Sequence, residues 1–311
     1  MADLLSICQH AARKCQVEVP SAIVGSSNET AKILLACAQD EGEALSRRPD
    51  TAWKALIREH TFDIVLSGTT DGTTANKLVD STTTFTTSDV TIGDVVKNTT
   101  DSTESTVTAV AANEVTLADD IFVSGEAYSI HRQAHSLPSD WKYQIDDTAW
   151  DRDYYWQMRG PLSQVEWQTY KSSVLGDTAT VRRRFQYRSD MATANPEVKL
   201  YLDPKPSDDA TIVVEYLTTG WCKDASAGTV NSEWLKDTDI PLLDDYLVRL
   251  GVIWRALSRF GLPYEEEMHE YDVEVENAIG RDGGGRTLDL SRRPFPSLIS
   301  TCNVPDTGFG Q

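Results

Sequence analysis

The stretch WDRDYYWQMRGPLSQVEWQ, residues 150–168, brings aromatic rings and carboxylates together within a short length of chain. Asp151 and Glu166 lie there among three tryptophans and two tyrosines. A glycoside hydrolase uses two carboxylates that flank the scissile bond, and aromatic rings commonly stack on sugars. The stretch therefore contains the residue types of a glycan hydrolase or depolymerase that would use Asp151 and Glu166.

The same stretch also fits a structural role. Tryptophan and tyrosine are the residues that dominate buried protein interfaces. Ser163 and Glu166 form an S-x-x-E capping box, which gives this glutamate a task at a helix start. No paired motif elsewhere in the sequence fixes a second catalytic face, so we assign no catalytic residue and expect a packed joint. Its candidates for the core or for a subunit interface are Trp150, Tyr155, Trp156, Arg159 and Trp167.

Two further groups have some features of metal sites. A calcium ion would take several of the neighbouring aspartates Asp146, Asp147, Asp151 and Asp153, but their spacing lacks the D-x-D-x-D-G loop pattern. His131 and His135 are four residues apart without an HExxH motif or a nearby cysteine, so we expect ordinary surface histidines. The sequence predicts no metal and no cofactor.

The run VRRRFQYR, residues 181–188, is the one basic segment. On a strand its arginines Arg182, Arg184 and Arg188 share a face. Contact with DNA is one reading of such a face. We favour a contact between subunits, because the chain has an excess of acidic groups to pair with these arginines.

The composition restricts the class of protein. The 311 residues are enough for one large domain or two smaller ones, and 48 acidic against 29 basic residues give a net charge of -19. That charge opposes binding to nucleic acid or anionic lipid. Five scattered cysteines without a CxxC motif indicate a reducing compartment. We also expect no signal peptide and no membrane span, since no run of about 18 apolar residues occurs.

The first sixty residues are predicted to be helical. Helical spacing covers residues 3–16, 28–47 and 51–60, with a capping box at Ser26 and Glu29 before the second helix. From residue 67 to residue 129 the chain becomes rich in Thr, Ser, Val, Asp and Gly, in short alternating segments between turn residues. This predicts a small inserted β-domain. A disordered linker is the alternative, although the apolar residues suffice for a modest core.

The remainder is predicted to mix strands and helices. VRRRFQYR, EVKLYLDP and ATIVVEYLTTGW each indicate a strand, with residues 204–209 as the turn between the last two as antiparallel partners. Pro241 is expected to open a helix that ends at Gly261, and Pro263 to start a second helix, which together make a helical hairpin. The last segment is poor in packing residues, yet it carries apolar side chains, so we expect it to dock on a partner.

The predicted fold class is α+β, with a helical-bundle body, a small antiparallel sheet, an inserted small β-domain and an extended C-terminal tail. Four parts follow: residues 1–64 as the first part of the helical core, 65–133 as the insert, 134–282 as the second part of the core, and 283–311 as the tail.

Several segments, taken in order, resemble the head-to-tail connector adaptor proteins of tailed bacteriophages. The most specific are LPSDW at residues 137–141, the pair Trp150 and Asp151, and MRGPLSxxEW at residues 158–167. NETAKILLACAQDEGEALSRRPDTAWKALIREHTFD precedes them, and the strands around FQYRSD and KLYLDPKP and the closing hairpin follow. The resemblance covers roughly residues 1–64 and 134–300, and the insert departs from the shorter members.

The resemblance implies a structural virion protein at the head-tail interface, made in the host cytoplasm, and not an enzyme. It implies a ring of about twelve copies that joins the portal to a tail nozzle or tail tube and lets genomic DNA pass without specific binding. The insert would contact tail fibres, neighbouring subunits or the capsid. Another tail component, such as a tube or fibre-attachment protein, is a further alternative. The tail residues expected to contact the portal are Arg292, Arg293, Phe295, Leu298 and Ile299.

Overall fold

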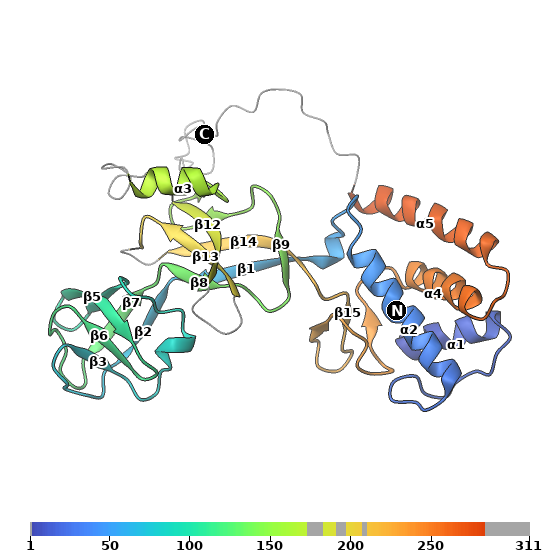
Figure 1. Ribbon diagram of the computed structural model, residues 1–311, viewed down its shortest axis with the longest axis horizontal. Coiled ribbons are helices and arrows are strands. Elements are labelled where there is room, and N and C mark those ends of the chain that lie inside the picture. The colour runs from blue at the N-terminus through green and yellow to red at the C-terminus, as the bar shows by residue number, and fades with distance from the viewer. Residues whose placement is uncertain (1, 173–182, 191–196, 207–209, 284–311) are drawn as a thin grey trace, which may run out of the picture. The chain divides into compact units, whose positions relative to one another are not determined.

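The computed structural model describes residues 2–172, 183–190, 197–206 and 210–283 (Figure 1). Two compact units divide these residues. The helical unit consists of residues 2–58, 140–144 and 216–283, and the β unit consists of the described residues within 59–139 and 145–215. Among the helices described, none is both long enough and apolar enough to cross a membrane.

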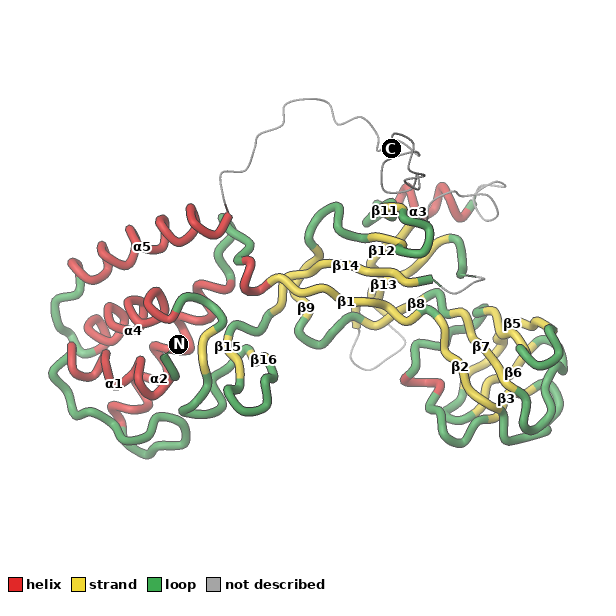
Figure 2. The backbone as a smooth tube through the Cα atoms, turned by 180° about the vertical axis from the view of Figure 1, so that it is seen from behind, coloured by secondary structure: helices red, strands yellow, loops and turns green. Residues whose placement is uncertain are grey.

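Four α-helices, drawn in red in Figure 2, build most of the helical unit. They are α1 (Leu4–Lys14), α2 (Glu29–Ser46), α4 (Asp245–Arg259) and α5 (Glu265–Gly283). Helix α4 packs against each of the other three. A side-chain oxygen of Asp3, Asn28 or Asp244 caps the first turn of α1, α2 and α4, respectively. The apolar faces of the four helices meet in one continuous core.

A buried carboxylate links three of these helices. Glu41 of α2 is fully buried, and it accepts hydrogen bonds of 2.7 Å from Arg255 Nε of α4 and of 2.7 Å from the Tyr271 hydroxyl of α5. Burial raises the pKa of Glu41, against the lowering effect of both hydrogen bonds. Gly251 of α4 lies over this carboxyl group, and a Cβ there would be 2.0 Å from Glu41 Cδ. Only glycine lets the helix pass so close to the glutamate.

Short strands complete the helical unit. β15 (Cys222–Lys223) pairs with β16 (Val230–Asn231) and with β17 (Ile240–Pro241), in both cases antiparallel. β9 (Trp141–Gln144) pairs with the last residues of β14 (Thr211–Thr218), and the rings of Trp141 and Tyr216 stack there with centroids 4.8 Å apart.

A six-stranded antiparallel sheet occupies residues 65–131 of the β unit. In spatial order its strands are β2 (Val65–Thr69), β7 (Ala127–His131), β4 (Val95–Asn98), β5 (Thr103–Val110), β6 (Glu114–Leu117) and β3 (Lys77–Val79). Its core contains Phe85 of the 3-10 turn η2 (Phe85–Thr87) and Tyr128, whose hydroxyl donates to Asp80 at 2.8 Å. The disordered-linker alternative is therefore wrong. Ile92 of the same segment is 71% exposed.

Two other sheets share the β unit. One has the order β12 (Arg184–Asp190), β13 (Glu197–Asp203) and β8 (Ala134–Ser136). In the other, β1 (Ile57–Asp63) lies beside β14, whose first residues pair with β10 (Trp150–Asp151), and β10 pairs in turn with β11 (Trp156–Gln157). Helix α3 (Gln164–Lys171) follows β11.

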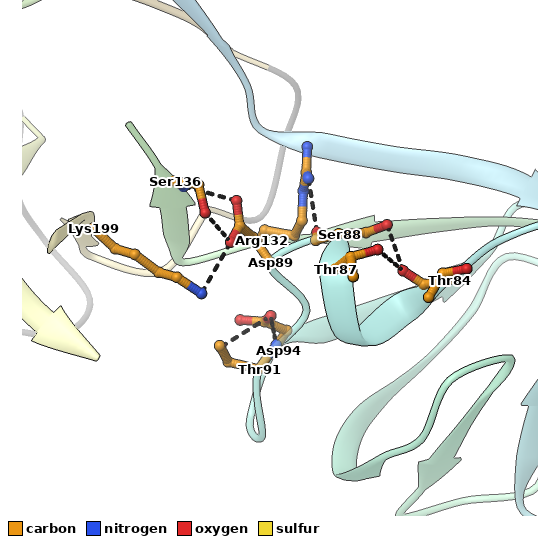
Figure 3. A network of polar contacts seen from close by, with 9 residues as sticks. All are labelled: Thr84, Thr87, Ser88, Asp89, Thr91, Asp94, Arg132, Ser136 and Lys199. Carbon is orange, nitrogen blue, oxygen red and sulfur yellow. Dashed lines mark hydrogen bonds and ion pairs between the residues drawn. The ribbon is translucent and has the colours of Figure 1, made fainter. Parts of the chain in front are cut away.

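A polar network connects the six-stranded sheet to the three-stranded sheet, as Figure 3 shows. Asp89, in the loop before β4, accepts hydrogen bonds from the backbone N of Ser136 at 2.7 Å and from its Oγ at 2.6 Å, and lies 3.0 Å from Lys199 Nζ. Asp94 is buried and accepts a hydrogen bond of 3.2 Å from the backbone N of Gln133. Because Ser136 lies in β8 and Lys199 in β13, the loop is fastened to two strands of the neighbouring sheet.

The predicted helical-bundle body is wrong. The described residues are mostly β, with five helices and several antiparallel sheets. The physical reason is that many of the strands are only two to four residues long, as in β9, β10, β11 and β15, which is too short to show a period of two.

The predictions for several individual elements are wrong as well. The helix predicted over residues 51–60 is a single 3-10 turn, η1 (Lys54–Leu56), followed by β1. Pro241 lies in β17, and α4 begins only at Asp245. Asn28, rather than Ser26, caps α2. β13 and β14 belong to different sheets, so residues 204–209 do not join antiparallel partners.

The prediction of surface histidines is also wrong. His131 in β7 and His135 in β8 are each only 3% exposed. His135 Nε2 lies 3.1 Å from the backbone O of Arg132, and its ring packs edge-on against Phe62. The two histidines therefore belong to the interior of the β unit.

Replacing Gly251 by alanine is expected to destabilise the helical unit. The added Cβ would collide with the Glu41 carboxyl group, and overpacking of this kind costs about 1–3 kcal/mol. Gly280→Ala on α5 is the matched control, because a Cβ there has no neighbour within 4 Å. The control should gain up to about 1 kcal/mol from helix propensity. Urea unfolding followed by circular dichroism measures both, and equal effects would contradict the account of Gly251.

His135 is expected to make stability depend on pH. Burial, followed by the charge of Arg132, lowers the pKa of His135 from 6.5 to about 4. Between these values the unfolded chain binds a proton that the folded chain does not, so stability is fully present above pH 6.5 and falls toward pH 4. His135→Gln should remove this pH dependence, which amounts to about 3 kcal/mol of unfolding free energy between pH 6.5 and pH 4. Melting temperatures of both proteins between pH 4 and pH 7 measure it, and parallel profiles would contradict the assignment.

Candidate functional site

A tight hairpin displays the aromatic residues at the start of the acidic aromatic stretch. In it Asp151 of β10 is the register partner of Trp156 of β11. Asp151 Oδ1 accepts hydrogen bonds from the backbone N of Asp153 at 3.2 Å and of Tyr154 at 3.3 Å, which fixes the turn. At its tip Tyr154 is 47% exposed and Tyr155 is 61% exposed.

Tyr155 has an unusual backbone conformation. Its φ of 57° lies in the left-handed region, which bulky residues other than glycine rarely adopt. The turn therefore holds a large aromatic side chain outward at some conformational cost. Behind it Trp156 is half-buried, and its indole N–H has no hydrogen-bond partner among the residues described.

The carboxylate of Asp151 is engaged in a buried ion pair. Arg183 Nε lies 2.8 Å from Asp151 Oδ2, and the two side chains are 11% and 4% exposed, respectively. The guanidinium group of Arg183 also lies 5.9 Å from the ring centroid of Tyr154, which stacks on Trp156. Both oxygens of Asp151 therefore have partners within the protein, one in the turn and one in the arginine.

Glu166 has the structural role that its spacing predicts. Its backbone N donates to Ser163 Oγ at 3.3 Å, while its carboxylate accepts from the backbone N of Ser163 at 3.0 Å, so the capping box at the start of α3 is confirmed. The backbone hydrogen bond, followed by the Ser163 hydroxyl, lowers the pKa of Glu166. Trp167, one residue further on, is 3% exposed and lies in the interior.

A second ion pair lies between β12 and β13. Arg184 and Asp203 are directly opposite each other in the register, and Arg184 Nη2 lies 2.6 Å from Asp203 Oδ2. Lys171, at the end of α3, lies 2.9 Å from Asp203 Oδ1. The guanidinium group of Arg184 stands 4.1 Å from the ring centroid of Tyr170 in α3. Two buried side chains thus hold the helix against the strand pair.

The chain before α3 is joined to the same strand. Arg159 forms a bridge with Arg184, and its carbonyl O accepts a hydrogen bond of 3.1 Å from the backbone N of Phe185. Gly160 follows, where a Cβ would be 2.6 Å from the carbonyl O of Phe185. A side chain at position 160 would therefore push this segment away from β12.

Four of the eight residues predicted for the core or a subunit interface lie in one cluster, which we call the arginine–aromatic cluster. Trp156, Arg159, Trp167 and Arg184 lie in it, and Tyr155 stands on its exposed hairpin. Trp150 is half-buried on β10. Arg188 is exposed, with its guanidinium group 5.6 Å from the ring centroid of Tyr201. Arg182 and the predicted portal contacts Arg292, Arg293, Phe295, Leu298 and Ile299 lie outside the described residues.

Sequence reasoning missed three members of the cluster. They are Arg183, Tyr170 and Asp203. The capping box places Tyr170 and Lys171 in the last turn of α3, which was a usable signal. The pairing of Asp203 with Arg184 depends on the register of β12 with β13, which no local pattern reveals.

The two carboxylates of the hydrolase alternative, Asp151 and Glu166, both have partners within the chain. A general acid at neutral pH needs a raised pKa, whereas the pKa of Glu166 is lowered, and Asp151 already neutralises Arg183. Of the aspartates of the calcium alternative, Asp146 and Asp147 are exposed, and Asp151 pairs with Arg183. In the part of the chain that the structure describes, no group of three or more His, Cys, Asp or Glu side chains is placed to hold a metal ion.

The pair Arg184 and Asp203 is expected to contribute strongly to the stability of the β unit. Asp203→Leu leaves the buried Arg184 without its carboxylate and should cost about 3–5 kcal/mol. Arg184→Met should cost less, because Lys171 still pairs with Asp203. The double variant should recover much of the loss, since a buried pair and an apolar pair have similar stability. Urea unfolding of the four proteins completes a double-mutant cycle, and purely additive costs would contradict the coupling.

Known proteins add no assignment to this geometry. No family model matches the chain, and no curated protein matches it. The functional inference therefore depends on the arginine–aromatic cluster and on the motifs of the sequence.

Proposed function

We propose that this chain is a structural subunit of the head-to-tail adaptor ring of a tailed bacteriophage. The ring joins the portal to the tail nozzle or tail tube and continues the DNA channel. The main support for the proposal is the way in which the arginine–aromatic cluster pairs its charges and exposes its tyrosines. Its carboxylates are paired internally, while the hairpin tip presents Tyr154 and Tyr155 outward.

This combination suits assembly better than catalysis. A catalytic carboxylate must reach a substrate, but Asp151 is 3% exposed and Glu166 closes a capping box. Exposed tyrosines, by contrast, are the typical anchors of protein interfaces, because each buries a large ring and keeps a polar tip. The MRGPLSxxEW motif that carries the resemblance to adaptors is the segment that builds this cluster.

The charge of the chain fits passage of DNA. With a net charge of -19, few phosphates would find a cation to hold them, so DNA would slide along such a protein without specific binding. In the helical unit, Glu265, Glu266 and Glu270 of α5 are exposed. We expect the inner wall of the assembled ring to be acidic. A reconstruction of the ring with a basic inner wall would contradict this part of the proposal.

The partners follow from the same proposal. The chain would assemble with itself into a ring of about twelve copies within the virion and bind the portal through residues 283–311. The six-stranded sheet would contact tail fibres, neighbouring subunits or the capsid. Mixing the purified protein with its portal, followed by mass photometry and electron microscopy, tests the ring directly. Degradation of host polysaccharide by a monomer would instead support the hydrolase alternative.

Removal of residues 284–311 is expected to abolish portal binding without unfolding the subunit. The described residues build both cores without residues 284–311, so we expect the truncated protein to keep its circular dichroism spectrum and melting temperature. Pull-down with the portal measures the loss, which should exceed tenfold in affinity. The matched control exchanges Arg292 and Arg293 for serine within the full chain. It separates the contribution of charge to portal binding from the contribution of the apolar side chains. Unchanged binding of the truncated protein would refute the portal assignment.

A further inference from the structure

We propose that the Tyr155 hairpin of one copy inserts into an apolar hollow in the helical unit of a second copy. The hollow has a volume of about 240 Å³. Its walls are formed by Trp53, Ala55, Leu242, Leu243, Leu247 and Ala278. This inference rests on the proposed ring and names the surfaces that join its subunits.

The hollow has the chemical pattern that accepts a tyrosine. Its walls are mostly apolar, and its charged lining residues are Asp244, Asp282 and Arg281. Arg281 pairs with Glu274, so the two aspartates keep the hollow acidic. One oxygen of Asp244 caps α4 through the backbone N of Tyr246, and one oxygen of Asp282 accepts from the backbone N of Lys54. Each carboxylate has a second oxygen, to which a phenol hydroxyl can donate. An aromatic body with a hydroxyl at its tip matches this pattern.

The hairpin has the complementary pattern. Tyr155 is 61% exposed at the tip of the turn, in a left-handed conformation that the turn maintains against the preference of a bulky residue. Strained exposed residues of this kind cluster at sites of recognition. Arg152, beside the tip, is 54% exposed and brings positive charge toward the two aspartates of the hollow, although it also pairs with Glu59.

The two surfaces differ, and this determines the kind of assembly. A contact between a projection on one copy and a hollow on the next is heterologous, so every copy keeps one free projection and one free hollow until the chain of contacts closes. Rings arise from such contacts, whereas a contact between two identical patches ends at a dimer. The hairpin and the hollow therefore fit a ring subunit.

Cross-linking between differently tagged copies tests the contact. Tyr155→Cys copies are mixed as a small minority with an excess of Ala55→Cys copies, both in a Cys302→Ser background, so that unaltered Tyr155 hairpins can close most contacts of each ring. The mixture is assembled on the portal and treated with a short bismaleimide. The four other cysteines of the chain are buried and should contribute little background. The control pair uses Val165→Cys, which is 76% exposed on α3, in place of Tyr155→Cys. We expect the Tyr155→Cys pair to give at least five times more mixed dimer than the control pair.

The outcomes separate the contact from the ring. If rings form and the Tyr155→Cys pair gives no more mixed dimer than the control, the contact is wrong and the proposed function stands. If no ring forms with the portal, both are wrong. A second variant, Tyr155→Gly, keeps the left-handed turn without the side chain, so its melting temperature should not fall, while its assembly into rings should drop at least tenfold. Undiminished assembly of Tyr155→Gly would also overturn the contact.

Discussion

The buried contact between Arg184 and Asp203 determines how the β unit is organised. A guanidinium group placed opposite a carboxylate on the next strand can remain buried only if its charge is neutralised there, so the pair enforces the register of β12 with β13. Lys171 and Tyr170 join the same pair from α3, and Arg159 joins it from the segment before the helix. The helix, the segment before it and the strand pair thus meet at this buried pair, while the neighbouring Arg183 holds the hairpin through Asp151.

The helical unit follows the same physical principle with different residues. Glu41 is buried among helices that would otherwise meet through apolar side chains, and Arg255 and Tyr271 satisfy its two oxygens. A buried charge of this kind adds little net stability. It does penalise any helix packing that separates the three side chains, and Gly251 permits the close approach that the correct packing needs. In both units the buried polar contacts favour one packing over the others that the apolar side chains alone would allow.

Local patterns in the sequence predicted the elements that depend on local interactions. The capping box at Ser163 and the long helices α1, α2, α4 and α5 were found because helical spacing and caps involve residues near each other in the chain. The fold class was wrong, because two-residue strands such as β10 exist only through pairing with distant partners. Trp156 and Trp167 were recognised because they lie in one short aromatic stretch of the chain, whereas Tyr170 was missed. The pairing of Arg183 with Asp151 and of Arg184 with Asp203 required the three-dimensional register.

The six-stranded sheet begins and ends on neighbouring strands. Val65, the first residue of β2, is paired with His131, the last residue of β7, so the chain leaves and re-enters the rest of the β unit at nearly one point. A module attached in this way can be gained or lost in a single genetic event, because the flanking backbone needs only a short turn to close. Asp89 and Asp94 then hold the module against the rest of the β unit through their hydrogen bonds to Ser136 and Gln133. Loss of the sheet would therefore leave the strands on either side of it in place.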